Sequence, residues 1–211
     1  MIDLSKNILA LLRYTNFQSK SQAGGGQSIL EHYQKIKDQL PYQMKGEFIR
    51  NVRDNLTSQS SCSMSIDRIG AKDQAAKGKV DHTGDWSIFG QIMRKIKEQK
   101  YKPLMMNQAT DKCWSTRFVH EGGIDDTGLF RESLYEFSVE LMTSALPLLV
   151  KTANNKNDCG ENREKFILNP ASSSPSHIDM YEFLGSMIGM SVRADHLLNI
   201  EMASPFWKNI L

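Results

Sequence analysis

One stretch, residues 114–141, constrains the fold of this chain more than any other, because it changes from the period of a strand to the period of a helix. One side of the expected strand consists of alternating residues: Trp114, Thr116, Phe118 and His120. This period of two predicts a half-buried strand that ends at Glu121. Gly122 and Gly123 then permit backbone angles that residues with a side chain rarely adopt.

A helix is expected to follow this turn. Asp125, Asp126 and Thr127 can accept hydrogen bonds from the free N–H groups at a helix start, and the acidic pair suits the positive end of the helix dipole. The helix should begin near Gly128. Its apolar stripe is Phe130, Leu134, Phe137 and Leu141, and the residues expected mostly off this stripe are Arg131, Glu132, Glu136 and Glu140.

Short strands and helices also alternate on either side of this stretch. Cys62, Met64 and Ile66 alternate with polar residues as in a strand. The loop KVDHTG at 79–84 precedes a helix with the apolar residues Trp86, Phe89, Met93 and Ile96. A later helix within 177–200 is expected to have the stripe Tyr181, Leu184, Ile188 and Val192. Its Gly185 and Gly189 lack side-chain bulk, so we expect another element to approach that helix closely.

Four segments of the sequence resemble, in the same order, parts of the N-lobe of HECT-type ubiquitin ligases. They are FGQI at 89–92, FVHEGGIDDTGLFRE at 118–132, FILNP at 166–170 and YEFLGSMIG at 181–189. One departure is Thr127-Gly128, where many members have Gly-Gly, and the capping ability of Thr tolerates it. The resemblance implies an α+β, mainly helical fold. We expect an incomplete HECT N-lobe with short strands over residues 61–211, preceded by a helical extension over residues 1–58.

The resemblance also implies a function. A HECT-type E3 ubiquitin-protein ligase is an acyltransferase that takes ubiquitin from the thioester of a ubiquitin-conjugating enzyme (E2) onto its own cysteine and passes it to substrate lysines. The implied partners are an E2, ubiquitin and a protein substrate. The family's nucleophilic cysteine is expected beyond Leu211, in a C-lobe that follows the E2-binding part, so the chain alone should be inactive. An alternative of another class stays open, a non-catalytic interaction or scaffold module derived from a HECT ligase.

The cysteines within the sequence do not match the family's late cysteine motif. Cys62 lies in a strand pattern, Cys113 opens the central strand, and Cys159 lies in a polar loop. The neighbours of Cys159 include Asp158 and Glu161, whose carboxylates disfavour a nucleophilic thiolate. No catalytic residue is therefore expected among these three.

Metal and cofactor sites are not expected either. A metal or acid–base cluster could use His120, Glu121, Asp125 and Asp126. Their spacing fits no metal motif, and turn and capping roles account for the acids. The other histidines are scattered, at His32, His82, His177 and His196. The glycines at 24–26 lack the Gly-Lys-Ser/Thr ending of a phosphate-binding loop.

The balance of charge argues against a nucleic acid or a membrane as partner. The sequence has 26 Lys and Arg against 24 Asp and Glu, a net charge of +2. A basic set is interpreted as a solvated helix face: Arg94, Lys95, Lys97, Lys100 and Lys102. An odd number of widely spaced cysteines favours a reducing compartment, and no apolar run reaches about 18 residues. The sequence also lacks a secretory signal, so we expect a cytoplasmic protein.

Overall fold

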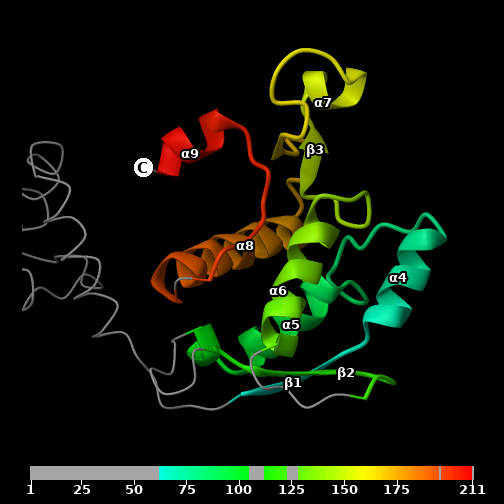
Figure 1. The fold of residues 1–211 in the computed structure, drawn as a ribbon, viewed down its shortest axis with the longest axis vertical. Helices are drawn as coiled ribbons and strands as arrows, with labels where there is room; N and C mark the ends of the chain where they lie inside the picture. Colours follow the sequence, from blue (N-terminus) through cyan, green and yellow to red (C-terminus); the bar gives the residue numbers. More distant parts are fainter. Residues whose placement is uncertain (1–61, 105–111, 123–127, 195, 211) are drawn as a thin grey trace, which may run out of the picture. The chain divides into compact units, whose positions relative to one another are not determined.

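A computed structural model describes residues 62–104, 112–122, 128–194 and 196–210 (Figure 1). All of them belong to one unit, residues 58–211. The elements follow in the order β1 (Ser63–Ile66), α4 (Arg68–Ala76), α5 (Ile88–Glu98), η2 (Lys102–Leu104), β2 (Ser115–Phe118), α6 (Gly128–Leu141), β3 (Leu149–Lys151), α7 (Ala153–Asn157), β4 (Phe166–Leu168), α8 (Pro175–Ala194) and α9 (Ser204–Ile210). The fold is therefore α+β and mainly helical, as the sequence predicts.

The predicted extension over residues 1–58 lies outside the described residues, and so does most of the acidic turn, with Asp125, Asp126 and Thr127. The division of the chain into an extension and a domain stays a prediction. Within the described ranges, no helix is both long enough and apolar enough to cross a bilayer.

The strands β1 and β2 pair in parallel, with Ser63 opposite Ser115 and Ile66 opposite Phe118 (Figure 1). A parallel pair needs a crossover connection, which α4 and α5 supply. The predicted alternation is confirmed, because one face of the pair is buried: Cys62, Met64, Ile66, Trp114, Thr116 and Phe118. The prediction is wrong at His120. The strand ends at Phe118, and His120 is exposed with a φ of 63°, so it has left the strand conformation.

The helix α6 begins at Gly128 and buries the predicted stripe, with Phe130, Leu134, Phe137 and Leu141 each no more than 3% exposed. Aromatic rings from three helices meet at its centre. Phe89 of α5 stacks on Phe137 at a centroid distance of 5.1 Å. Phe183 of α8 meets Phe89 and Phe137 edge-on, at 5.3 and 6.2 Å. These contacts join the segments that the sequence predicted separately as helices.

The helix α8 is present as predicted, but its buried stripe overlaps the predicted one only in part. The buried residues are Met180, Phe183, Leu184, Met187, Met190 and Ala194, whereas Val192 is 64% exposed. The predicted stripe is confirmed at Leu184, which is buried, and in part at Tyr181 and Ile188, which are half-buried against the core. It is wrong at Val192, because flexible methionine side chains fill the core on the adjacent face. The expected close approach at Gly185 and Gly189 is also wrong for the described residues, since both are exposed and a Cβ added at either would have no atom within 4 Å.

The close approach occurs instead at Gly90, in the first turn of α5. A Cβ at this position would lie 2.1 Å from the carbonyl oxygen of Gly84. Gly84 itself has a φ of +79°, which residues with a side chain rarely adopt. The pair lets the loop before α5 fold back onto the helix.

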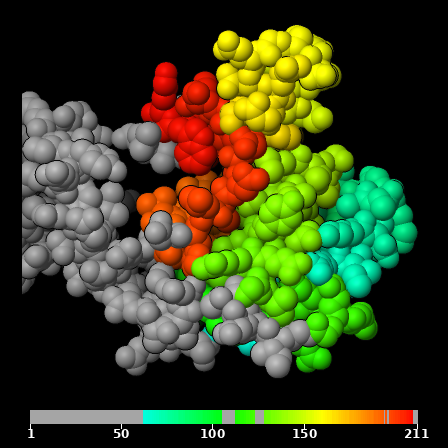
Figure 2. All heavy atoms as spheres, viewed as in Figure 1, coloured from blue at the N-terminus to red at the C-terminus, as the bar shows by residue number. Residues whose placement is uncertain are grey.

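The strands β3 and β4 form a separate antiparallel pair, in which Leu149 is opposite Leu168. The hydroxyl of Tyr181 in α8 donates to the carbonyl oxygens of Leu148 at 2.7 Å and Asn169 at 3.2 Å, which fixes both strand ends to the helix. The segment around α7 buries no helix residue and projects beyond α6 in the space-filling view (Figure 2). The last helix, α9, begins at Ser204, and a proline follows in its first turn, where the missing N–H group costs no helical hydrogen bond.

We predict that Phe137→Ala lowers the free energy of unfolding by about 3 to 5 kcal/mol, because a fully buried aromatic ring leaves a cavity at the junction of three helices. Denaturant titration measures the change. Tyr135→Ala on the same helix is the control, since Tyr135 is 59% exposed and its loss should cost less than about 0.5 kcal/mol. Equal effects of the two changes would contradict the assigned core face.

We predict that Gly90→Ala destabilises the protein by about 1 to 3 kcal/mol, because the new methyl group meets backbone rather than a movable side chain. Gly185→Ala is the matched control in a helix with open space, where Ala should be neutral or stabilise by up to about 1 kcal/mol. Thermal unfolding of the two variants tests the contrast. Similar midpoints would rule out a tight contact at Gly90.

Candidate functional site

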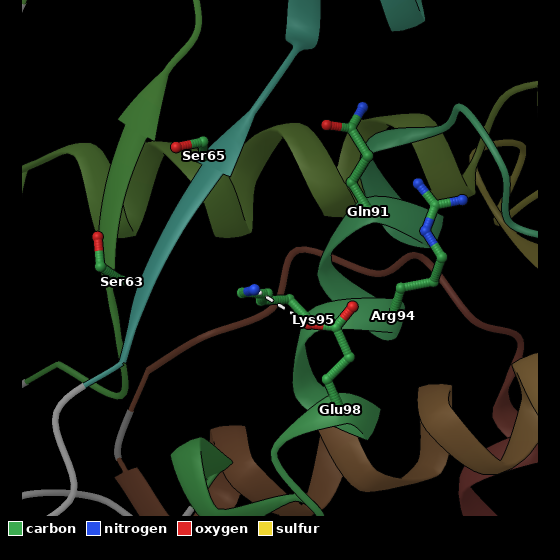
Figure 3. Close-up of a pocket in the computed structure, with 6 residues that line it drawn as sticks. All are labelled: Ser63, Ser65, Gln91, Arg94, Lys95 and Glu98. Carbon is green, nitrogen blue, oxygen red and sulfur yellow. Dashed lines mark hydrogen bonds and ion pairs between the residues drawn. The ribbon is translucent and has the colours of Figure 1, made fainter.

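An open groove lies between β1 and α5 and is mainly polar (Figure 3). Its lining residues are Ser63, Ser65, Gln91, Arg94, Lys95 and Glu98. Lys95 extends toward β1 and pairs with Glu98 at 3.0 Å, with the two side chains 45% and 61% exposed. The groove therefore depends on how α5 is held beside the strand.

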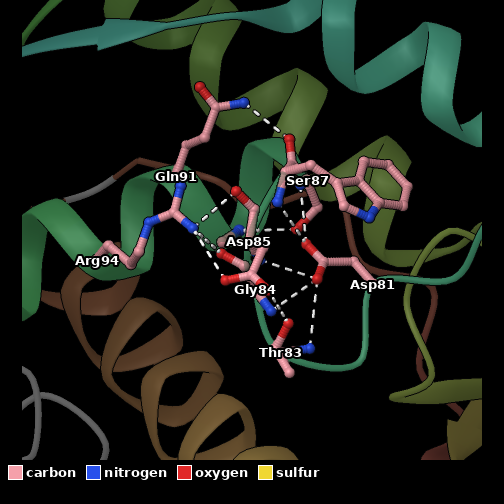
Figure 4. Close-up of polar contacts among 9 residues, drawn as sticks. Asp81, Thr83, Gly84, Asp85, Ser87, Gln91 and Arg94 are labelled. Atoms are coloured by element: carbon pink, nitrogen blue, oxygen red, sulfur yellow. Dashed lines mark hydrogen bonds and ion pairs between the residues drawn. The ribbon is translucent and has the colours of Figure 1, made fainter.

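The buried carboxylate of Asp81 organises the loop that leads into α5 (Figure 4). Its side chain accepts five backbone N–H groups, those of Thr83, Gly84 and Asp85 on Oδ1 at 3.3, 2.8 and 2.9 Å and those of Trp86 and Ser87 on Oδ2 at 3.1 and 2.9 Å. Burial alone would raise the pKa of Asp81, but these hydrogen bonds, foremost those from Ser87, outweigh it and hold the pKa below its ordinary value. The loop is thus folded around a charge.

Glu140 of α6 provides hydrogen-bond acceptors for the N–H groups at the start of α5. Its two carboxylate oxygens accept the N–H groups of Ile88 at 3.0 Å and Phe89 at 2.8 Å, while Ser87 caps the helix by accepting from the N–H of Gly90 at 3.0 Å. The free N–H groups of the first turn are therefore satisfied by buried side chains. The periodicity of the sequence predicts Glu140 mostly off the apolar stripe, but Glu140 is only 8% exposed, because its partner is a helix end rather than water.

The environment of Glu140 favours its neutral form. Burial is the main cause, and the nearby carboxylates of Asp81 and Glu136 add to it, so that the two N–H bonds offset the effect only in part. The pKa of Glu140 is raised to about 7. Its protonation state therefore changes close to neutral pH.

The sequence candidate Glu121 is the partner of an arginine. Arg68 donates from Nε to Oε1 of Glu121 at 2.7 Å and from Nη2 to Oε2, and Nη1 donates to Glu132. The guanidinium group also lies 4.2 Å from the centre of the Phe118 ring and 3.5 Å from Glu136. The hydrogen bond from Arg68 lowers the pKa of Glu121. This network fixes α4 to α6 and to the end of β2.

The metal or acid–base cluster of His120, Glu121, Asp125 and Asp126, which the sequence does not favour, is not assembled around Glu121, whose oxygens are occupied by Arg68. The two aspartates lie outside the described residues. In the ranges that the structure covers, no group of three or more His, Cys, Asp or Glu side chains could hold a metal ion.

Two histidines that are scattered in the sequence meet in the structure. Nδ1 of His82 lies 3.2 Å from Nε2 of His177, although the two are 95 residues apart. They join the loop before α5 to the first turn of α8. No spacing rule could have predicted this pair.

Two of the three cysteines are inaccessible. Cys62 and Cys113 are buried, and only Cys159 is exposed. Burial raises the pKa of the Cys62 thiol, and the side-chain amide of Gln99 donates to its sulfur at 3.1 Å. Cys159 follows Asp158, which pairs with Arg163 at 3.4 Å.

The basic set expected on one helix face is divided in the structure. The helix α5 ends at Glu98, so Lys100 and Lys102 lie beyond it. Lys97 pairs with Asp179 of α8 at 2.5 Å. Arg94 donates to the carbonyl oxygens of Gly84 and Asp85 at 2.8 and 2.7 Å (Figure 4).

We predict that Glu140 makes the protein less stable as the pH rises from about 4.5 to 7. Its pKa is higher in the folded state than in the unfolded chain, so the folded state holds more protons in this window, and the stabilisation present at low pH is lost as the pH passes the folded value. The loss should amount to roughly 3 kcal/mol at most. The difference between the stability profiles of the wild type and Glu140→Gln, measured by denaturant titration across this range, isolates the effect.

Glu182→Gln is the control, because Glu182 is exposed on α8. Its profile should run parallel to that of the wild type. A parallel profile for Glu140→Gln as well would contradict the prediction.

Comparison with known proteins agrees with this architecture. The HECT-domain (ubiquitin-transferase) family matches residues 128–211, which contain α6 to α9. The E3 ubiquitin-protein ligase HERC2 of Mus musculus is 33% identical over 146 residues, and that of Homo sapiens 32% over the same length; both matches cover 69% of this chain and 3% of the relative. E3 ubiquitin-protein ligase Smurf1 of Drosophila melanogaster is 28% identical over 119 residues, which are 55% of this chain and 11% of the relative.

The chain thus spans only a small part of the length of these relatives, and the part that matches the family includes α6 with its buried stripe. Residues 128–211 form part of a HECT domain, and the chain belongs to the family of HECT-domain ubiquitin transferases.

Proposed function

We propose that this chain is part of a HECT-type E3 ubiquitin-protein ligase that transfers ubiquitin from an E2 to lysines of a substrate protein. The observation that carries the proposal is the family match over residues 128–211, supported by similarity to named ubiquitin ligases over 146 residues. The chain spans only 3% of the length of the HERC2 relatives. The activity and the partners of the complete protein are therefore assigned to it only as part of this proposal.

The chemistry of such a ligase consists of two acyl transfers. A cysteine thiolate attacks the carbonyl carbon of the E2–ubiquitin thioester, and the E2 cysteine leaves as a thiol. The amine of a substrate lysine then attacks the new thioester, which forms an isopeptide bond and releases the ligase cysteine. Each step exchanges one acyl bond for another, so no oxidant, metal or cofactor takes part.

In this proposal the cysteine that carries ubiquitin lies outside the 211 residues, in a C-lobe, and the chain alone does not form the thioester. The burial of Cys62 and Cys113 supports this assignment, because an E2 thioester could not reach either sulfur. Cys159 has an acidic neighbour, Asp158, and no described histidine or lysine pairs with it. The described residues serve as the scaffold on which the catalytic parts are arranged.

The E2 and ubiquitin are the partners expected for this function, through parts of the domain beyond the described residues. We also propose a cytoplasmic location. The free thiols of Cys62, Cys113 and Cys159 are in keeping with a reducing compartment.

We predict that the recombinant 211-residue chain forms no thiol-sensitive ubiquitin adduct when incubated with ubiquitin-activating enzyme, ATP, ubiquitin and a panel of E2s. The native product, captured with an antibody against this chain, should form one and should be heavier than 24.0 kDa. Non-reducing electrophoresis with and without thiol detects the adduct, and intact mass gives the size.

Cys159→Ser serves as the control for adventitious reaction of the exposed thiol. An adduct on the recombinant chain that this change abolishes would overturn the assignment of the nucleophile. A native product of 24.0 kDa without an adduct would overturn the ligase proposal in favour of a non-catalytic module.

A further inference from the structure

The free edge of β1 borders the groove beside α5. In the parallel pair, the N–H of Ser115 donates to Cys62 and the N–H of Val119 donates to Ile66, so the even-numbered residues of β1 face β2. The backbone N–H and C=O groups of Ser63 and Ser65 consequently point to the opposite edge. In the part of the chain that the structure describes, the only hydrogen bond to these groups comes from the Cys62 thiol, whose sulfur lies 4.0 Å from the carbonyl oxygen of Ser63.

At Asp67, the next outward-facing position on this edge, a side chain takes the place of a neighbouring strand. The side-chain amide of Gln91 accepts from the N–H of Asp67 at 2.8 Å and donates to its C=O at 3.1 Å. These are the two bonds that a neighbouring strand would make. The same amide donates to the carbonyl oxygen of Trp86 at 2.9 Å, so it is held rigidly at the end of the groove. Among the described residues, the edge is thus covered at Asp67 and open at Ser63 and Ser65.

The devices that commonly protect an edge strand are few here. β1 contains no proline and no charged residue, and its two outward side chains are exposed serines. Serine side chains are small, so a peptide could approach the backbone of the strand. The edge offers four hydrogen-bonding groups along a polar floor formed by α5.

The surroundings of the open edge are basic. Lys95 lies on the floor of the groove, and Arg117, which is opposite Ser65 in the register, is exposed on the outer face of the sheet. No described acid pairs with Arg117, and the exposed pair of Lys95 with Glu98 is weak enough to exchange. Arg94 lies where the groove meets the loop before α5, but its charge is partly balanced by Asp85, whose carboxylate is 3.5 Å away. Only one lining residue, Glu98, is acidic.

We propose that the open edge of β1 binds an extended, acidic segment of a partner protein, which adds to the sheet as a third strand. Main-chain bonds to Ser63 and Ser65 supply the pairing, and carboxylates of the segment meet Lys95 and Arg117. Gln91 ends the added strand at Asp67. This binding site is independent of ubiquitin transfer, and it selects a partner protein by an exposed acidic segment.

Fluorescence polarisation with the 211-residue chain and a labelled heptapeptide of alternating Glu and Val tests the proposal. The acidic peptide should bind at least about tenfold more tightly than a peptide with Lys in place of Glu. It should also bind about tenfold more tightly than an acidic peptide whose backbone amides are all N-methylated, which has no N–H group left to donate to a strand edge. The methylated peptide tests the pairing without any change to the protein.

Ser65→Pro tests the site on the protein side. Proline removes the outward N–H of Ser65, which β2 does not use, so the strand pair remains while peptide binding falls at least about tenfold. Ser65→Thr is the matched control and should bind within about twofold of the wild type, since it keeps the N–H. Lys95→Glu should reverse the preference between the acidic and basic peptides, whereas Lys77→Glu, at the end of α4, should not.

Several results would overturn the proposal. Equal binding of the methylated peptide would exclude strand addition, and equal binding of the acidic and basic peptides would exclude the assigned charge complementarity. Dimerisation of the chain that Ser65→Pro abolishes, without binding of any peptide, would show that the edge pairs with a second copy instead.

Discussion

The described structure depends on how the first turn of α5 is satisfied. A helix start leaves backbone N–H groups without partners, and burying them without acceptors would cost several times the value of an ordinary hydrogen bond. Here Asp81 accepts hydrogen bonds from the N–H groups of the preceding loop, and Glu140 accepts those from Ile88 and Phe89. Two buried carboxylates therefore fix α5 between the loop and α6. The ring stack of Phe89 on Phe137 and the groove beside β1 both follow from that position.

Periodicity predicted the elements of this fold well where one face is apolar. The stripe of α6 and the alternation in β1 and β2 are seen as expected, because a period of 3.6 or 2 specifies which residues can be buried together. Periodicity was insufficient for α8, where Met180, Met187 and Met190 are buried while Val192 is exposed. A helix with apolar residues on more than one face offers two stripes, and only the tertiary contacts select between them.

The sequence did not predict which polar side chains would form hydrogen bonds across the fold. The loop of Asp81 contained a local signal, an Asp followed by Thr, Gly and a Ser cap, that could have identified it as a folded turn. Nothing local marks Glu140 as the acceptor for a helix start 51 and 52 residues away, or His82 as the neighbour of His177. Family resemblance predicted the architecture because it carries such long-range pairings implicitly. The free edge of β1 required the register of the strands.

The acceptor role of Glu140 also bears on the order in which the chain can fold during synthesis. The ribosome delivers α5 well before α6, and until residue 140 has emerged the first turn of α5 has only water and its own Ser87 cap as acceptors. The bonds from Arg68 to Glu121 and Glu132 span similar distances, 53 and 64 residues. Contacts that are so distant along the chain slow folding, since the loops between them must close before any bond forms. The first third of this domain is therefore translated before the side chains that complete its hydrogen bonds, and it cannot reach its final packing until α6 has been synthesised.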